Sequence, residues 1–275
     1  MTSPPSYRLR VWRRLRSCLF VLVSSLALFS TNFSAAQAAS IRIGWTAWSD
    51  AEFVTKLAKQ LIEARLGHQV DLTLVDIALQ YQGLASGDLD IMLMAWLPDT
   101  HADYHKRFAD RVVDLGPIYT GAKLGWVVPA YVPEEDISTI SELSQPNVAS
   151  RLTRELSGID PGAGLTRLSE NAIKAYELER YNLIASSGAA MTAMVERSHR
   201  RKKWIVATAW RPHWMFHEWE LRFLDDPKRT LGGPQRVHAL VGRGLETKAP
   251  GVVDMLARLY LPLSDLELSL IHISE

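Results

Sequence analysis

Three strand-like runs of apolar residues in this chain each end in Ala-Trp and are followed at once by polar residues. They are Ile41–Trp48, Ile91–Trp96 and Trp204–Trp210. In open α/β sheets, ligands bind in the crevice beyond the carboxyl ends of parallel strands, so these three indoles are expected to face a shared crevice. A quaternary ammonium has no N–H to donate, and aromatic faces attract it directly. The spacing therefore predicts an aromatic box made by Trp48, Trp96 and Trp210.

A second group of residues suits an anion. Gly158 and Ile159 open a glycine-containing loop, residues 158–164, that leads into an expected helix. Free backbone N–H groups and the positive end of a helix dipole favour a carboxylate at such a place. His101 follows five residues after Trp96 and could donate a further hydrogen bond. Glycine-rich turns are also common connectors and single histidines are often surface residues, so this group is weaker evidence than the tryptophans.

Core packing is the main alternative for any tryptophan in a strand. Trp45, Trp126 and Trp204 lie deeper in, or before, their apolar runs and are assigned to packing. The sequence contains no nucleophile elbow, no cysteine nucleophile in the part expected to be mature, and no phosphate-binding loop. It therefore gives no reason to expect an enzyme or a cofactor.

Two histidine pairs leave a metal site open as an alternative. His101 and His105 are four residues apart, as are His213 and His217, so each pair would share one face of a helix. Neither pair has the glutamate of the HExxH zinc hydrolases, and Pro212 argues against an established helix at His213. We expect no metal, and a secreted metal hydrolase is kept as the rival from another class.

Strand-like and helix-like segments alternate after Ala39, which predicts an α/β fold with a parallel sheet. A capping box formed by Ser49 and Glu52 is expected to start the first helix, and Gly67 to end it. Pro98 is expected to open a short helix that carries His101. Further helices are expected at 76–86, 164–176, 187–200 and 250–261, and further strands at 70–75, 181–185, 221–224 and 237–241.

Two lobes are expected around the crevice. The extended run Tyr119–Pro129 is the predicted first crossing between them. Residues 39–121 and 221–275 would form lobe 1, and residues 122–220 would form lobe 2. The indoles would then lie on both walls of a cleft. The last ten residues, 266–275, fit no element and are expected to be a frayed or truncated end.

Residues 1–38 have the pattern of a secretory signal peptide, with an uncleaved anchor as the alternative. Five arginines precede the apolar stretch Leu19–Phe29, and Ala36–Ala38 supplies a small-x-small cleavage pattern. Without this segment the 31 basic side chains fall to 26 against 30 acidic ones, a formal charge of −4, which does not suggest nucleic acid as a partner. Cys18, the only cysteine, lies inside the segment, so a periplasmic protein without disulfides is expected.

Several motifs occur together in an order that resembles one protein family. They are TAWSDAE (46–52), AWLPDTH (95–101), DLGPIYTGAKLGWVVP (114–129), GIDPGAG (158–164), SSGAAMTA (186–193), AWRPHWMF (209–216) and LDDPK (224–228). From about Ile41 to Leu263 the chain resembles the glycine betaine/proline betaine substrate-binding proteins of ABC importers. The resemblance implies a two-lobe type II periplasmic binding-protein fold with the ligand cleft between the lobes. The chain departs from the family pattern at its end, where a further helical segment is expected.

The resemblance also implies residue roles. The three predicted box tryptophans match the cage around the trimethylammonium group. Gly158 and Ile159 match the backbone amides that hold the carboxylate, and His101 matches its side-chain partner. A monomeric receptor that delivers glycine betaine or proline betaine to a membrane permease is implied. Choline, carnitine and ectoine-type compounds are rival ligands, and a sensor-linked binding domain without transport is a further alternative.

Overall fold

The computed structural model of the chain describes residues 40–274, which belong to one unit of mutually contacting elements. The segment predicted to be a signal peptide, residues 1–38, lies outside the described residues. Among residues 40–274, no helix combines the length and the apolar character needed to cross a membrane.

Helices and strands alternate along the chain. The first elements are β1 (Ile41–Trp45), α2 (Ser49–Leu66), β2 (Val70–Leu74), α3 (Ile77–Ser86), β3 (Ile91–Leu97), α4 (Ala102–Phe108) and β4 (Val112–Pro129). The next are η1 (Ile140–Ser144), α5 (Pro146–Ala149), β5 (Glu155–Ser157), α6 (Gly164–Ala175), β6 (Asn182–Ile184), α7 (Gly188–Arg200) and β7 (Val206–Arg211). The last are α8 (Met215–Glu218), β8 (Leu221–Phe223), β9 (Gln235–Gly242), α9 (Leu245–Lys248), α10 (Pro250–Ala257) and α11 (Leu263–Ser274).

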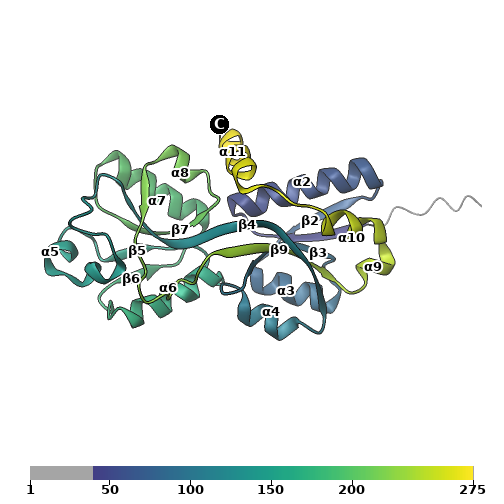
Figure 1. Ribbon diagram of the computed structural model, residues 1–275, viewed down its shortest axis with the longest axis horizontal. Helices are drawn as coiled ribbons and strands as arrows, with labels where there is room; N and C mark the ends of the chain where they lie inside the picture. The colour runs from purple at the N-terminus through teal and green to yellow at the C-terminus, as the bar shows by residue number, and fades with distance from the viewer. Residues whose placement is uncertain (1–39, 275) are drawn as a thin grey trace, which may run out of the picture. The chain divides into compact units, whose positions relative to one another are not determined.

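The long strand β4 joins two groups of strands. The strands hydrogen-bond in the order β2-β1-β3-β9-β4-β7-β5-β6, and β8 also pairs with β4. Residues 112–122 of β4 pair with β9, whereas residues 123–129 pair with β7 and β8. We call β2, β1, β3, β9 and the first part of β4 sheet A, and the second part of β4 with β7, β8, β5 and β6 sheet B. Figure 1 shows β4 passing from one to the other.

Parallel pairing within each sheet positions the strand exits. β1 pairs in parallel with β2 and β3, and β5 pairs in parallel with β6 and β7. Every residue of β3 is buried, as expected for a strand covered on both faces. Figure 1 shows α2 on one face of sheet A and α3 and α4 on the other. The predicted α/β alternation with parallel strands is confirmed, although the antiparallel position of β9 between β3 and β4 was not predicted.

The start of α2 differs from the prediction, while its end agrees. Gly67 ends the helix in the left-handed region at φ 68°, which glycine adopts without steric cost. The predicted capping box is wrong, because Trp48 occupies the N-cap position and no side chain caps the helix. The hydroxyl of Ser49 is buried and has no hydrogen-bond partner among the described residues. Glu52 instead pairs with Lys56 one turn later.

Two further segments correct the sequence interpretation. Pro98 does not open a helix, since α4 begins only at Ala102. Residues 266–275, expected to be frayed, lie largely within α11. Leu266 and Leu270 of this helix are buried, because their apolar side chains, four residues apart, share one face.

The strand β8 also lies elsewhere than expected. The segment 221–224 was predicted to return to the first lobe, but β8 pairs with residues 127–129 of β4 in sheet B. The chain returns to sheet A only with β9. The predicted lobe boundary at residue 220 therefore falls before a strand that still belongs to sheet B.

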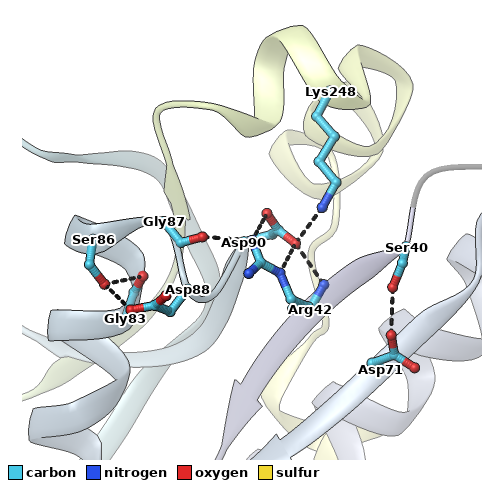
Figure 2. A network of polar contacts seen from close by, with 9 residues as sticks. All are labelled: Ser40, Arg42, Asp71, Gly83, Ser86, Gly87, Asp88, Asp90 and Lys248. Atoms are coloured by element: carbon cyan, nitrogen blue, oxygen red, sulfur yellow. Dashed lines mark hydrogen bonds and ion pairs between the residues drawn. The ribbon is translucent and has the colours of Figure 1, made fainter.

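A polar network fixes the beginnings of β1 and β3 (Figure 2). The carboxylate of Asp90 accepts hydrogen bonds from the backbone and guanidinium of Arg42 and from Nζ of Lys248, at 2.8–3.1 Å. Burial alone would raise the pKa of Asp90, but these hydrogen bonds outweigh it and hold the pKa below its ordinary value. The network lies at the opposite end of the strands from Trp48 and Trp96, so it is structural and leaves the strand exits free.

Candidate functional site

The indoles of Trp48, Trp96 and Trp210 line one small cavity between the two sheets. Trp48 precedes α2, Trp96 lies in β3 and Trp210 lies in β7. Their exposed fractions are 6%, 2% and 3%. The other lining residues are Thr100, His101, Leu124, Ile159, Ala163, Gly164 and Leu165. The free volume is about 20 Å³, which is room for roughly one water molecule. The rings are therefore closed on one another, and a methylated group enters only when they separate.

Two of the indoles are held by carboxylates. The rings of Trp48 and Trp210 have centroids 6.2 Å apart and planes inclined at 57°. Nε1–H of Trp48 donates to Oδ2 of Asp160 at 2.8 Å, and Nε1–H of Trp210 donates to Oδ1 of Asp50 at 2.9 Å. Asp160 follows strand β5 of sheet B, whereas Asp50 lies in α2 beside sheet A. Each bond therefore joins groups carried by different sheets.

His101 is positioned as a neutral hydrogen-bond donor. It is 1% exposed and occupies the N-cap position of α4. Its Nδ1 accepts the backbone N–H of Trp96 at 3.1 Å, so the remaining proton of the neutral ring lies on Nε2. Nε2 is buried and has no partner within residues 40–274. Burial, assisted by the positive charge of Arg167, lowers the pKa of His101 to about 3. The ring thus presents a donor without carrying a charge.

The first turn of α6 lies beside His101. Ala163, at the N-cap position, makes no side-chain cap, so the helix N–H groups at this end have no partner inside the helix and carry positive potential. A Cβ added to Gly164 would lie 2.5 Å from the carbonyl oxygen of Thr100 and 3.1 Å from Cδ2 of His101. Only glycine allows the helix to come this close. The start of α6 and His101 are therefore suited to a carboxylate.

Gly158 and Ile159, the two loop residues predicted to bind an anion, differ from each other in their positions. Ile159 lines the cavity. The N–H of Gly158 donates instead to the carbonyl oxygen of Ile184 at 2.9 Å, and a Cβ there would lie 2.8 Å from Cδ1 of Leu183. Gly158 therefore serves the close approach of the loop to β6, and this arrangement does not support its predicted role as an anion donor.

Two buried polar residues beside the indoles were not identified from the sequence. The hydroxyl of Tyr119 donates to Oδ2 of Asp50 at 2.5 Å. Burial raises the pKa of Asp50, opposed by the hydrogen bonds from Tyr119 and Trp210, and burial also raises the pKa of Tyr119. A signal was present, because Asp50 begins the row of buried positions that continues with Val54 and Ala58 along α2. A carboxylate in that row needs partners from another element.

The side chains of two other histidines of the predicted pairs, His213 and His105, contact groups away from His101. Nδ1 of His213 accepts the backbone N–H of Met215 at 3.0 Å, and His105 lies near Asp114. Among residues 40–274 there is no group of three or more His, Cys, Asp or Glu side chains that could hold a metal ion. The metal-hydrolase alternative has no geometric support in this part of the chain.

We expect acid to destabilise the fold through its buried histidines. His101 and His213 each have a pKa of about 3 in the folded chain, against about 6.5 when unfolded. Between these values the unfolded chain binds more protons, so the free energy of unfolding falls as the pH drops below about 6.5. His101→Gln should reduce this slope by up to ~1.4 kcal/mol per pH unit. Urea unfolding between pH 4.5 and 8 measures the slope, and an unchanged slope in the variant would show that His101 is not buried and neutral.

Comparisons with known proteins identify the family of the chain. The family described as "Substrate binding domain of ABC-type glycine betaine transport system" (OpuAC) matches residues 39–270. The glycine betaine/carnitine transport binding protein GbuC of Listeria monocytogenes serotype 1/2a (strain 10403S) is 31% identical over 160 residues, which cover 58% of this chain and 50% of that protein. The match thus spans half the length of this curated relative.

Two solved structures are similar over most of the chain. Lactococcal OpuAC, in its closed-liganded conformation complexed with glycine betaine, is 31% identical with a TM-score of 0.78. The match covers 86% of this chain and 90% of the lactococcal chain. The glycine betaine/L-proline-binding protein ProX of Borrelia burgdorferi is 34% identical with a TM-score of 0.78 and covers 86% of each chain. These likenesses confirm the expected periplasmic binding-protein fold. The chain belongs to the OpuAC family, the substrate-binding domains of ABC-type glycine betaine transport systems.

Proposed function

We propose that this chain is the periplasmic substrate-binding component of an ABC importer and captures glycine betaine or a close relative. The observation that carries the proposal is the meeting of three indoles, the free Nε2 of His101 and the start of α6 in one cavity. We propose that the aromatic faces form one end of the ligand site and the hydrogen-bond donors the other. A betaine has a methylated cation at one end and a carboxylate at the other.

The aromatic end accounts for selectivity toward a quaternary ammonium. Each desolvated cation–π contact contributes about 0.5–2 kcal/mol, so three faces contribute a few kcal/mol. The N–H edges of Trp48 and Trp210 are already bonded to carboxylates. Their π-faces are the surfaces that remain for a ligand.

The polar end accounts for the carboxylate. His101 Nε2–H, the N–H of Ile159 and the first turn of α6 are the donors that support binding there. Hydrogen bonds to a charged group contribute about 1.5–3 kcal/mol each. Together with the cation–π contacts, and after the cost of association, this is compatible with micromolar affinity, about −8 kcal/mol.

Capture is proposed to involve opening and closing of the cleft between the sheets. The cavity is too small to admit a methylated group without separation of its walls, and the lactococcal relative is closed around glycine betaine. The closed form would be the one that a membrane permease recognises. We propose a monomer that binds without chemical conversion of the ligand and without a cofactor.

Choline and carnitine are the rival ligands. The Listeria relative is named as a glycine betaine/carnitine binding protein, so carnitine is retained as a candidate ligand. Choline lacks a carboxylate, so the uncharged donor His101 and the helix start would be left without an anionic partner. The donors at this end of the cavity favour a ligand with a carboxylate.

Titration calorimetry tests the proposal. The purified chain should bind glycine betaine with a dissociation constant of about 1–100 μM, and proline betaine within about tenfold of it. Choline should bind at least about tenfold more weakly, because it offers no anion to the polar end. Tighter binding of choline than of glycine betaine would overturn the carboxylate part of the proposal. No heat and no thermal shift with any of these compounds would overturn all of it.

A further inference from the structure

The indoles of Trp48 and Trp210 form two reciprocal hydrogen bonds across the cleft. Trp48, next to sheet A, donates its indole N–H to Asp160, which follows a strand of sheet B. Trp210, in sheet B, donates its indole N–H to Asp50, which lies beside sheet A. Each side of the cleft thus supplies one ring and one carboxylate. Both bonds exist only while the two sides are together.

We propose that Asp160 is a positioning residue that, together with Asp50, holds the cleft closed by binding the N–H edges of the cage indoles. The inference rests on the proposed function, since it assigns the closing contacts of that same site. Asp160 does not line the cavity but is bonded to Trp48, which does, so it would act on a ligand through Trp48. It would change the lifetime of the closed form and the orientation of the Trp48 indole.

The chemistry of the indole supports this assignment. An indole N–H is a donor only, and it needs an acceptor when it is buried. In an open cleft water serves as that acceptor, whereas in the closed cleft the carboxylates replace it. A bond from an N–H to a carboxylate is shorter and stronger than one between neutral groups. Two such bonds hold both rings by their N–H edges and do not occupy their π-faces.

The two carboxylates have different surroundings. Asp50 is fully buried and is also held by the hydroxyl of Tyr119, so its replacement would leave a buried tyrosine hydroxyl without its acceptor. Asp160 is only partly buried, and its side chain is bonded to Trp48. Asp160 is therefore the position at which closing can be changed with little effect on the fold.

A further contact joins the two sides of the cleft. Nη2 of Arg167 in α6 donates to the carbonyl oxygen of Thr100 at 3.0 Å, and Nη1 lies 3.4 Å from Oδ2 of Asp103. Asp103 and Arg167 are more exposed than the indoles, so this pair is worth less than the bonds to the indoles. It joins the same two sides and does not compete for Asp160.

The experiment compares three single variants with the wild type. Asp160→Ala removes the acceptor, whereas Asp160→Asn retains an oxygen that can accept the indole N–H. Asp136→Ala is the matched control, because Asp136 also pairs with one side chain, Arg151, but on the sheet B side alone. Stopped-flow tryptophan fluorescence gives the dissociation rate of glycine betaine. X-ray scattering gives the radius of gyration with and without glycine betaine, and calorimetric melting of the ligand-free chain reports on the fold.

The inference predicts a selective change in the dissociation rate. Asp160→Ala should release glycine betaine about tenfold faster, with an unchanged melting temperature of the ligand-free chain, because the lost bond belongs to the closed form. Asp160→Asn should stay within about threefold of the wild type, and Asp136→Ala should not differ from it. In a Trp48→Phe background, which has no N–H to bind, adding Asp160→Ala should change the rate little.

Three results would overturn the inference. They are equal dissociation rates for Asp160→Ala and the wild type, failure of Asp160→Asn to restore the rate, and an undiminished effect of Asp160→Ala in the Trp48→Phe background. If the wild type does not bind glycine betaine, the proposed function fails separately. The same dissociation rates are then measured with choline, whose methylated cation would occupy the same rings, and the same three results decide on the inference.

Discussion

Alanine at Trp48 or at Trp210 is expected to weaken glycine betaine binding at least about a hundredfold. Each replacement removes one desolvated π-face, and truncation of a central tryptophan typically loses 2 kcal/mol or more because water enters its place. It also deprives Asp160 or Asp50 of its indole donor. Phenylalanine at the same positions keeps a smaller π-face and should lose about tenfold or less. Titration calorimetry measures both sets.

The control for this prediction is a tryptophan outside the cavity. Trp204 was assigned to packing; it is partly buried, and its ring is covered by the guanidinium of Arg151 at 4.6 Å. Trp204→Ala should leave the affinity unchanged. Trp96 is a less suitable test, because it lies in the fully buried strand β3 and its removal would also destabilise the core by about 3–5 kcal/mol. If Trp48→Ala and Trp210→Ala bound like the wild type, the aromatic cage would be ruled out.

Gly164→Ala is expected to weaken binding by about 10–100-fold by preventing full closure. The added methyl would lie 2.5 Å from both the carbonyl oxygen and Cγ2 of Thr100 on the other side of the cleft, a distance that the backbone must relieve by moving. Overpacking of this kind costs about 1–3 kcal/mol, and here only the closed form bears it. The ligand-free chain should therefore keep its melting temperature, while the ligand-induced rise in melting temperature becomes smaller.

Gly162→Ala provides the matched comparison in the same loop. A Cβ at Gly162 would meet no atom within 4 Å, so this variant should bind glycine betaine like the wild type. Equal affinities for Gly164→Ala and Gly162→Ala would show that the contact between Gly164 and Thr100 is not part of the bound state. Reduced affinity in both would indicate an effect of loop stiffness instead of a collision.

The alternation of strands and helices, and the exits of Trp48, Trp96 and Trp210, could be predicted because they depend on local patterns. Apolar runs of strand length followed by a polar turn give both the strand and the place where it ends. His101 could be placed by its distance from Trp96, although its position at the N-cap of α4 could not. The tautomer of His101 depends on the backbone N–H of Trp96, a contact that only the folded chain shows.

Residues that act across the cleft could not be found in this way. Asp160 and Trp48 are 112 positions apart, and Asp50 and Trp210 are 160 positions apart, so no local spacing connects them. The capping-box interpretation of Ser49 and Glu52 was wrong because Trp48 itself is at the N-cap position. The backbone N–H of Gly158 was expected to be free, but it donates to the carbonyl oxygen of Ile184 in β6, a strand farther along the chain.

The continuity of β4 has a consequence for how the molecule can be divided. One continuous strand pairs with β9 along its first part and with β7 and β8 along its second. Neither half of the protein could be expressed alone without leaving part of this ribbon unpaired, and an unpaired strand edge invites aggregation. We therefore expect thermal melting to be a single cooperative transition, and opening of the cleft to bend β4 itself because this strand belongs to both sheets.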